Sequence, residues 1–202
     1  MTEQTRTTNF FELVKTGTPQ SVQAAISTGA AVNTRDDYGR TPLMVAARFN
    51  PDPEVITVLL KAGADIKAQV NDGATPLMFA ARYNQNPEVI TVLLKAGADI
   101  KAQVNDGATP LTVAARYNSN PEVITTLLKA GADIKARYQA GWTALMQAAR
   151  WNQNPEVITT LLKAGADAKA KNREGKTAFD YARGNEKLKG TDAYRQLQEA
   201  SQ

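Results

Sequence analysis

Residues 75–108 read TPLMFAARYNQNPEVITVLLKAGADIKAQVNDGA, and this 34-residue pattern recurs along the chain. Residues 41–74 differ from it at only four positions. A threonine followed by proline or alanine opens each unit, and these threonines are Thr41, Thr75, Thr109, Thr143 and Thr177. A fixed period of this size is typical of proteins built from stacked repeats, in which each unit buries its apolar faces against its neighbours.

Each unit carries the signals of two short helices. Thr75 is an expected N-cap residue with proline in the first helical position, and apolar residues follow it at helical spacing. Asn84 is expected to end this first helix in the left-handed conformation. In the second helix, Asn86 is the expected N-cap and Gly97 the expected end. The remainder, residues 98–108, is too short and polar for a third helix and contains a strong turn signal, Asn-Asp-Gly.

The motif TPL followed by AA, and then EVIxxLLKxGAD, closely resembles the ankyrin repeat. The resemblance runs from Phe10 to the end of the chain. It implies an all-α solenoid of helix–turn–helix units, each with a projecting β-turn finger. Members of the family bind protein partners, mainly through these fingers and the concave face of the first helices. The NPEVITxLLKAGAD stretch is most similar to long bacterial versions of the repeat, and near-identical units also arise by duplication or by consensus engineering.

The chain departs from the usual ankyrin repeat at its caps and fingers. One residue is added between the helices, which lengthens the unit. The family's histidine after TPL is replaced in the four internal units by Met44, Met78, Thr112 and Met146. The finger aspartate of the family is kept at Asp36, and the later units carry Val70, Val104, Tyr138 and Asn172 there.

These patterns predict a single ankyrin-repeat domain at residues 10–202, preceded by a flexible tail at residues 1–9. Residues 10–40 and 177–202 are expected to be capping repeats with polar outer faces, which a stack needs at its ends. The internal repeats are expected at residues 41–74, 75–108, 109–142 and 143–176.

The chain contains neither cysteine nor histidine. Disulfides, thiolate or imidazole metal sites and Ser-His-Asp chemistry are therefore excluded. The recurring acidic residues have evident capping or solubility roles, and each glycine is explained by a helix end or a turn. We therefore expect no catalytic residues, no metal and no cofactor, and a protein that is not an enzyme.

The first helix of each repeat offers a candidate binding face. At about 100° per residue, its apolar core positions lie on one side and a triplet of other residues lies on the opposite side. The triplets are Val45, Arg48 and Phe49; Phe79, Arg82 and Tyr83; Val113, Arg116 and Tyr117; and Gln147, Arg150 and Trp151. Arginine, tyrosine and tryptophan are enriched at binding hot spots. In the alternative interpretation, the rings pack between repeats and each arginine pairs with a nearby acid.

The fingers vary between repeats more than the second helices do. Such variation over a constant scaffold fits recognition by projecting loops, and the alternative is neutral drift on solvated turns. The finger residues predicted to contact a partner are Tyr38, Asn71, Asp72, Tyr138 and Trp142.

The net charge of +4 is unevenly distributed. Residues 109–142 contain four basic and two acidic residues, and residues 143–176 contain six and three. Positive surface of this kind speeds encounter with acidic partners, so we expect an acidic protein partner to dock toward the C-terminal half. A row of lysines at equivalent positions has a simpler interpretation as a solvated edge, and it consists of Lys67, Lys101, Lys135 and Lys169.

Two other functions remain open from the sequence. Basic C-terminal fingers and arginine–aromatic pairs are also features of polyanion and nucleic-acid binding, although the modest charge and the absence of a lysine or arginine block argue against nucleic acid. The second open function is that of a purely structural spacer. We expect a monomer when unbound, and no apolar run is long enough to span a membrane. The compartment stays open between the cytoplasm and, if a leader was removed, the periplasm or outside.

Overall fold

The computed structural model describes the backbone of residues 3–202 and the side chains from Asn9 onward. The chain forms two compact units, Met1–Asp99 and Ile100–Gln202. Regular structure in the described residues is helical, apart from one isolated bridge between Tyr138 and Trp142. The all-α class and the helix–turn–helix repeats expected from the sequence are therefore confirmed.

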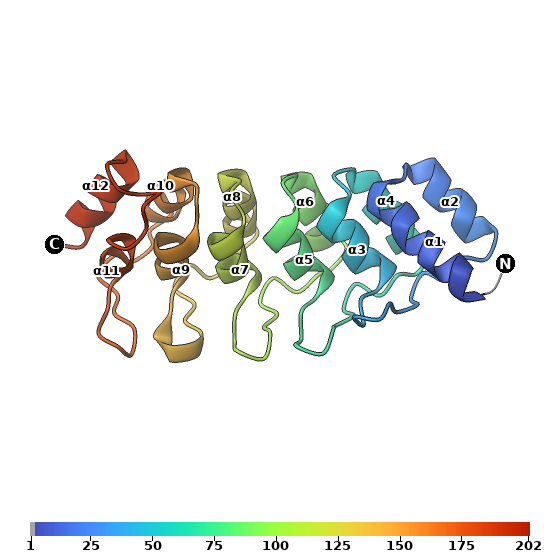
Figure 1. Cartoon of the computed structure of the whole chain (residues 1–202), viewed down its shortest axis with the longest axis horizontal. Coiled ribbons are helices and arrows are strands. Elements are labelled where there is room, and N and C mark those ends of the chain that lie inside the picture. The colour runs from blue at the N-terminus through green and yellow to red at the C-terminus, as the bar shows by residue number, and fades with distance from the viewer. Residues whose placement is uncertain (1–2) are drawn as a thin grey trace. The chain divides into compact units, whose positions relative to one another are not determined.

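The first unit contains three helical hairpins (Figure 1). Their helices are α1 (Glu3–Thr16), α2 (Pro19–Ser27), α3 (Pro42–Phe49), α4 (Pro53–Lys61), α5 (Pro76–Tyr83) and α6 (Pro87–Lys95). The first helices α1, α3 and α5 pack in one row, and the second helices α2, α4 and α6 pack in another. The core lies between these two rows, where Leu43, Leu59, Leu77 and Leu93 are fully buried.

The second unit repeats this arrangement with α7 (Pro110–Tyr117), α8 (Pro121–Lys129), α9 (Ala144–Trp151), α10 (Pro155–Lys163), α11 (Ala178–Ala182) and α12 (Asp192–Ala200). Helices α7, α9 and α11 form the first row, and α8, α10 and α12 form the second. In Figure 1 the fingers of this unit, one of which holds the short 3₁₀ helix η1 (Gln139–Gly141), project from the same side of the helices.

The first helix includes part of the segment for which the sequence analysis expects a flexible tail, residues 1–9. Helix α1 begins at Glu3, so residues 3–9 belong to it, and residues 1 and 2 lie outside the described part of the chain. Phe10 and Phe11 in this helix are buried. Burial of these rings docks α1 on α3, and a docked helix can extend beyond the residues that pack.

The helix starts agree with the sequence signals. Thr75 accepts a hydrogen bond from the backbone nitrogen of Met78, and Asn86 accepts one from that of Glu88. At the position that carries histidine in the usual repeat, other side chains accept the hydrogen bond that caps the helix. The thioether of Met44 and the hydroxyl of Thr112 accept hydrogen bonds from the backbone nitrogens of the N-cap threonines three residues earlier, at 3.4 and 2.7 Å.

The prediction for Asn84 is wrong, because its backbone is extended rather than left-handed. Its side-chain nitrogen donates to the carbonyl oxygens of Ala47 and Asn50 in the preceding repeat, at 3.0 and 2.8 Å. Its side-chain oxygen accepts from the backbone nitrogen of Asn86. The buried amide therefore joins two repeats and also positions the N-cap of the next helix.

The same asparagine recurs in both units. Asn50 donates to the carbonyls of Val14 and Gly17, and in the second unit Asn152 donates to those of Ala115 and Asn118. Asn185 makes the equivalent bonds to the repeat before it. Each amide satisfies carbonyls at the end of a neighbouring first helix, where the helix itself supplies no donor.

The fingers share one construction despite their different sequences. A glycine with positive φ closes each turn by donating to the carbonyl three residues earlier, as in Gly73 to Val70 and Gly141 to Tyr138, both at 2.8 Å. Loss of the family's aspartate in the later fingers therefore does not change the turn. Adjacent fingers are joined by Arg35, which donates to the carbonyl of Gln69 at 2.9 Å.

Candidate functional site

Arginine and aromatic side chains lie at the C-terminal ends of the first helices, and we call this surface the arginine–aromatic face. In the first unit it consists of Arg48, Phe49, Phe79, Arg82 and Tyr83 on α3 and α5. The guanidinium of Arg48 lies 4.6 Å from the centre of the Phe49 ring and 4.0 Å from that of Tyr83 in the next repeat. Arg48 therefore joins the ring beside it to the ring of the following repeat.

In the second unit the arginine–aromatic face consists of Arg116, Tyr117, Arg150 and Trp151 on α7 and α9. Arg116 lies 4.8 Å from the Tyr117 ring and 4.2 Å from the Trp151 ring. Arg150 lies 4.7 Å from the centre of the Trp151 ring as well. Such contacts between a cation and the face of an aromatic ring are attractive, and they fix the order of charges and rings.

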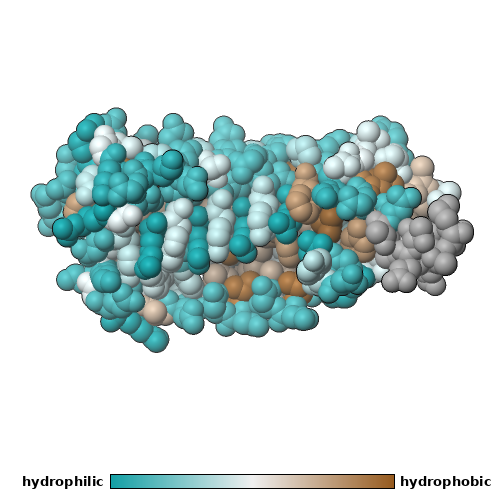
Figure 2. Space-filling view, viewed as in Figure 1, coloured by the Kyte–Doolittle hydropathy of each residue, from teal (hydrophilic) through white to brown (hydrophobic). Residues whose placement is uncertain are grey.

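The rings of this face are packed and yet remain open to solvent. Phe49, Tyr117 and Trp151 are 41, 43 and 37 % exposed, and with Tyr38 they are the exposed large hydrophobic residues of the described chain. Figure 2 shows strongly hydrophilic and near-neutral columns alternating over α7 and α9, the pattern expected of arginines set between tyrosine and tryptophan rings. The two interpretations left open by the sequence are thus combined, because the rings pack between repeats and also present surface.

Three residues expected on this face or beside it are buried. Val45 and Gln147 begin two of the predicted triplets, and they are 4 and 2 % exposed. They lie a full turn before the helix end, where the neighbouring repeats cover them. Trp142 of the finger is 8 % exposed, because it stacks against Trp151 at 5.0 Å and Tyr181 at 4.3 Å. Its ring supports the face from beneath.

The pairing of each arginine with a nearby acid, which belongs to the alternative interpretation, does not occur at Arg48, Arg116 or Arg150. Within residues 9–202 these three side chains form no ion pair, and the Nε atoms of Arg48 and Arg116 are buried without a hydrogen-bond partner. Their positive charge is therefore held by aromatic rings and is not neutralised by carboxylates of the described chain.

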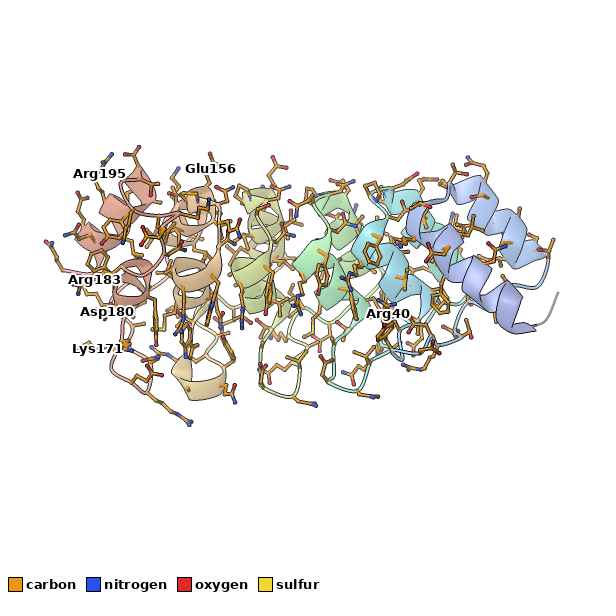
Figure 3. All side chains as sticks on the ribbon, in the orientation of Figure 1. Arg40, Glu156, Lys171, Asp180, Arg183 and Arg195 are labelled. Atoms are coloured by element: carbon orange, nitrogen blue, oxygen red, sulfur yellow. The ribbon has the colours of Figure 1, made fainter. Side chains whose placement is uncertain are left out.

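The structure adds residues that the sequence analysis missed. Lys15 of α1 lies 5.1 Å from the Phe49 ring and so occupies the position of the arginines in the first repeat. In the last repeat Arg183 is the exposed C-cap residue of α11, and its charge acts on Asp180 three residues earlier (Figure 3).

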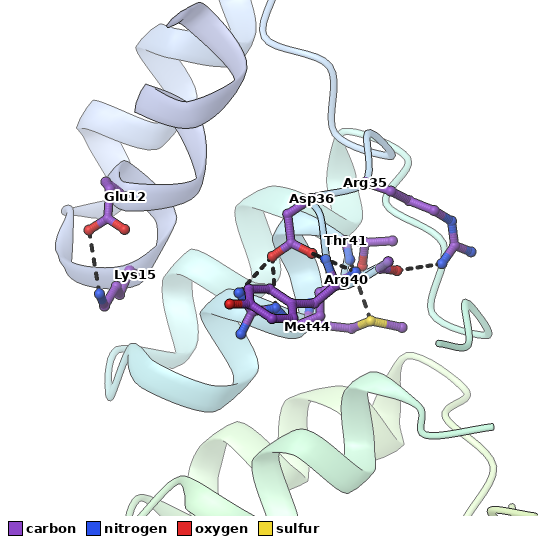
Figure 4. A network of polar contacts seen from close by, with 9 residues as sticks. Glu12, Lys15, Arg35, Asp36, Arg40, Thr41 and Met44 are labelled. Atoms are coloured by element: carbon purple, nitrogen blue, oxygen red, sulfur yellow. Dashed lines mark hydrogen bonds and ion pairs between the residues drawn. The ribbon is translucent and has the colours of Figure 1, made fainter. Parts of the chain in front are cut away.

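The first finger is held by Asp36. Its carboxylate accepts from the backbone nitrogens of Tyr38 and Arg40 and forms an ion pair with the Arg40 side chain at 2.7 Å (Figure 4). The Arg40 guanidinium also lies 4.7 Å from the Tyr38 ring, which is 76 % exposed. In the second finger Asn71 and Asp72 are exposed, and Asp72 accepts from the backbone nitrogen of Ala74. These residues present polar and aromatic groups on stiff turns.

The basic residues of the second unit fall into two groups. Lys169, Lys171 and Arg173 are exposed on the last finger. Arg137 instead donates to the carbonyl oxygens of Lys171 and Gly141, at 2.8 and 3.4 Å. Reversing the charge of Arg137 would therefore disturb the link between two fingers, so a test of electrostatic attraction belongs at Lys169 or Arg173.

Tyr138 packs against the preceding finger, where its Cβ would lie 3.5 Å from a Cβ added to Gly107. Burial raises the pKa of Tyr138 to about 12, and the charge of Arg116 opposes this shift. Between about pH 10, where an unfolded tyrosine ionises, and pH 12, the folded chain holds a proton that the unfolded chain releases. Stability must therefore fall as the pH rises through this range.

We accordingly expect the melting temperature of the wild-type protein to fall more steeply above about pH 10 than that of Tyr138→Phe. Thermal unfolding at a series of pH values for both proteins measures the difference. Equal alkaline losses in the two proteins would contradict the assignment.

Within the described residues there is no group of three or more acidic side chains arranged to hold a metal ion. No helix in that part of the chain has the length and apolar character needed to cross a membrane.

Comparison with protein families gives a consistent result. Residues 54–138 and 111–191 match the model of ankyrin repeats in three copies, and residues 26–76 match a model of ankyrin repeats in many copies. No curated protein matches the chain. Ankyrin repeats are generally modules of protein–protein interaction. The matched segments cover well over half of the residues, and the chain belongs to the ankyrin repeat family.

Proposed function

We propose that the protein is a non-enzymatic binding module that recognises a protein partner through the arginine–aromatic face and the fingers. The observation that carries this proposal is the exposure of Phe49, Tyr117 and Trp151 beside Arg48, Arg116 and Arg150, which form no ion pair within residues 9–202. Exposed aromatic surface is costly to leave in water, and arginine and aromatic residues dominate binding energy at interfaces.

The second helices support the same proposal by contrast. Their solvent-facing positions carry charged residues such as Glu122, Lys129 and Lys163, all exposed. Such a surface is typical of a solvated face, and it offers no aromatic anchor. A partner that buries apolar area therefore gains more on the arginine–aromatic face than on the opposite row of helices.

The proposal is tested by site-specific photo-crosslinking in an extract of the source cells. A photoreactive phenylalanine analogue is placed at Tyr117 on the arginine–aromatic face or, as the matched control, at Lys129 on the second helix. We expect one protein to be captured from position 117, with capture lost on adding excess unlabelled wild-type protein, and none from position 129. The proposed face would be contradicted if a protein were captured only from position 129 and lost on competition. It would also be contradicted if no protein were captured from either position.

A further inference from the structure

Two arginines of the second unit stand at equivalent positions near the ends of successive first helices, Arg116 on α7 and Arg150 on α9. Within residues 9–202 their side chains form neither an ion pair nor a hydrogen bond. The equivalent cation of the first repeat, Lys15, pairs with Glu12 at 3.4 Å. Arg116 and Arg150 thus carry charges that no carboxylate of residues 9–202 pairs with.

The rings hold these charges at a defined spacing. The guanidiniums of Arg116 and Arg150 lie 4.2 and 4.7 Å from the centre of the same Trp151 ring. Their separation is therefore no greater than the roughly 8–10 Å between packed helices. The Nε of Arg116 is buried, so its two terminal nitrogens are the donors that a ligand would meet. Two such nitrogens match a carboxylate with two parallel hydrogen bonds.

We infer that the second unit binds an acidic segment in the polyproline II conformation, with a carboxylate at every third residue. This conformation has three residues per turn and rises about 3.1 Å per residue, so every third side chain returns to one side after about 9 Å. That length lies at the upper limit of the separation between the Arg116 and Arg150 guanidiniums. A β-strand turns residues three apart to opposite faces and cannot place both carboxylates on these arginines.

The rings between the arginines favour the same ligand. Tyr117 and Trp151 are 43 and 37 % exposed and lie beside Arg116 and Arg150. Polyproline II segments dock on aromatic surfaces of this kind, because the preformed helix loses little conformational entropy. Prolines between the acidic residues would pack on the rings while the carboxylates reach the arginines. The inference rests on the proposed function and specifies the chemistry of the partner.

The spacing is tested with two synthetic peptides of identical composition and charge. One repeats Glu-Pro-Pro three times, and the other has three glutamates followed by six prolines. We expect the spaced peptide to bind the wild-type protein at least about tenfold more tightly in calorimetry at low salt. Equal affinities, or no binding of the spaced peptide, would overturn the inference.

The position of binding is tested with Arg150→Gln, Arg150→Lys and the matched control Lys163→Gln, which changes the same charge on the second helix. We expect Arg150→Gln to weaken the spaced peptide about tenfold, Arg150→Lys to restore only part of the loss, and Lys163→Gln to have no effect. Melting temperatures verify that each variant is folded. Equal weakening by Arg150→Gln and Lys163→Gln would show attraction by net charge alone and overturn the inference.

A single-stranded oligothymidylate with the same number of charges completes the test. Tighter binding of this probe than of the spaced peptide would favour nucleic acid and overturn the inference. If the peptides fail but crosslinking from Tyr117 still captures a protein, only the acidic polyproline II chemistry is wrong. If the peptides and the crosslinking both fail, the proposed function is wrong as well.

Discussion

Replacing Asn152 with alanine is expected to lower the free energy of unfolding by about 3–4 kcal/mol. The side chain is 2 % exposed and makes three hydrogen bonds to backbone groups. Its nitrogen donates to the carbonyls of Ala115 and Asn118, and its oxygen accepts from the nitrogen of Asn154. Alanine leaves all three groups without their partner, and an unsatisfied buried polar group costs about 1–3 kcal/mol.

Urea titration followed by circular dichroism measures this loss. The neighbouring Gln153→Ala is the matched control, because Gln153 is exposed and a surface substitution of this kind usually changes stability by less than about 0.5 kcal/mol. Asn152→Asp separates the two halves of the amide, since aspartate keeps the acceptor for Asn154 and loses both donors. A loss at Asn152→Ala no larger than that at Gln153→Ala would show that the buried amide is not what joins the repeats.

The sequence predicted the helices well because their signals are local. An N-cap residue, a proline in the first turn and a closing glycine act within a few residues, so their meaning does not depend on the rest of the fold. The start of α6 at Pro87 and the left-handed glycine at Gly97 follow directly from these rules. Because the units repeat every 34 residues, each local prediction for one unit also applied to the others.

Asn84 shows where local rules fail. Asparagine at a helix end has two roles, a left-handed cap and a donor to distant carbonyls, and nothing within its own repeat distinguishes them. The deciding partners are the carbonyls of Ala47 and Asn50 in the preceding repeat. The long-range role becomes visible only when one repeat is stacked on the next.

The candidate site was predicted in part for the same reason. Helical periodicity placed Arg116 and Tyr117 on one side of α7 and Trp151 on the equivalent side of α9, because each helix fixes which of its residues share a side. It did not reveal that Arg116 of one repeat stacks on Trp151 of the next at 4.2 Å. The sequence analysis also placed Trp142 on an exposed finger. Finger residues follow no helical period, so their burial cannot be predicted from sequence spacing. Contacts between repeats decide these details.

Replacing Trp142 and replacing Trp151 are therefore expected to have different effects, the first mainly on stability and the second mainly on partner binding. Trp142 is 8 % exposed and stacks on Trp151 and Tyr181, so Trp142→Ala is expected to cost about 3–5 kcal/mol of stability, the usual loss for a buried aromatic residue. Trp151 is 37 % exposed, and Trp151→Ala should cost less because solvent already reaches the ring. Urea titration of both variants measures the order of these losses.

Partner binding should follow the reverse order, with the larger loss in Trp151→Ala, when both variants are compared below their melting temperatures. Trp151→Ala removes exposed ring surface beside Arg116 and Arg150 and should abolish competition for the protein captured from Tyr117. A folded Trp142→Ala keeps that ring and should compete nearly as well as the wild type, because Trp142 only supports the face from beneath. If Trp151→Ala proves the more destabilising of the two while still competing fully, the ring is structural and the arginine–aromatic face is not where the partner binds.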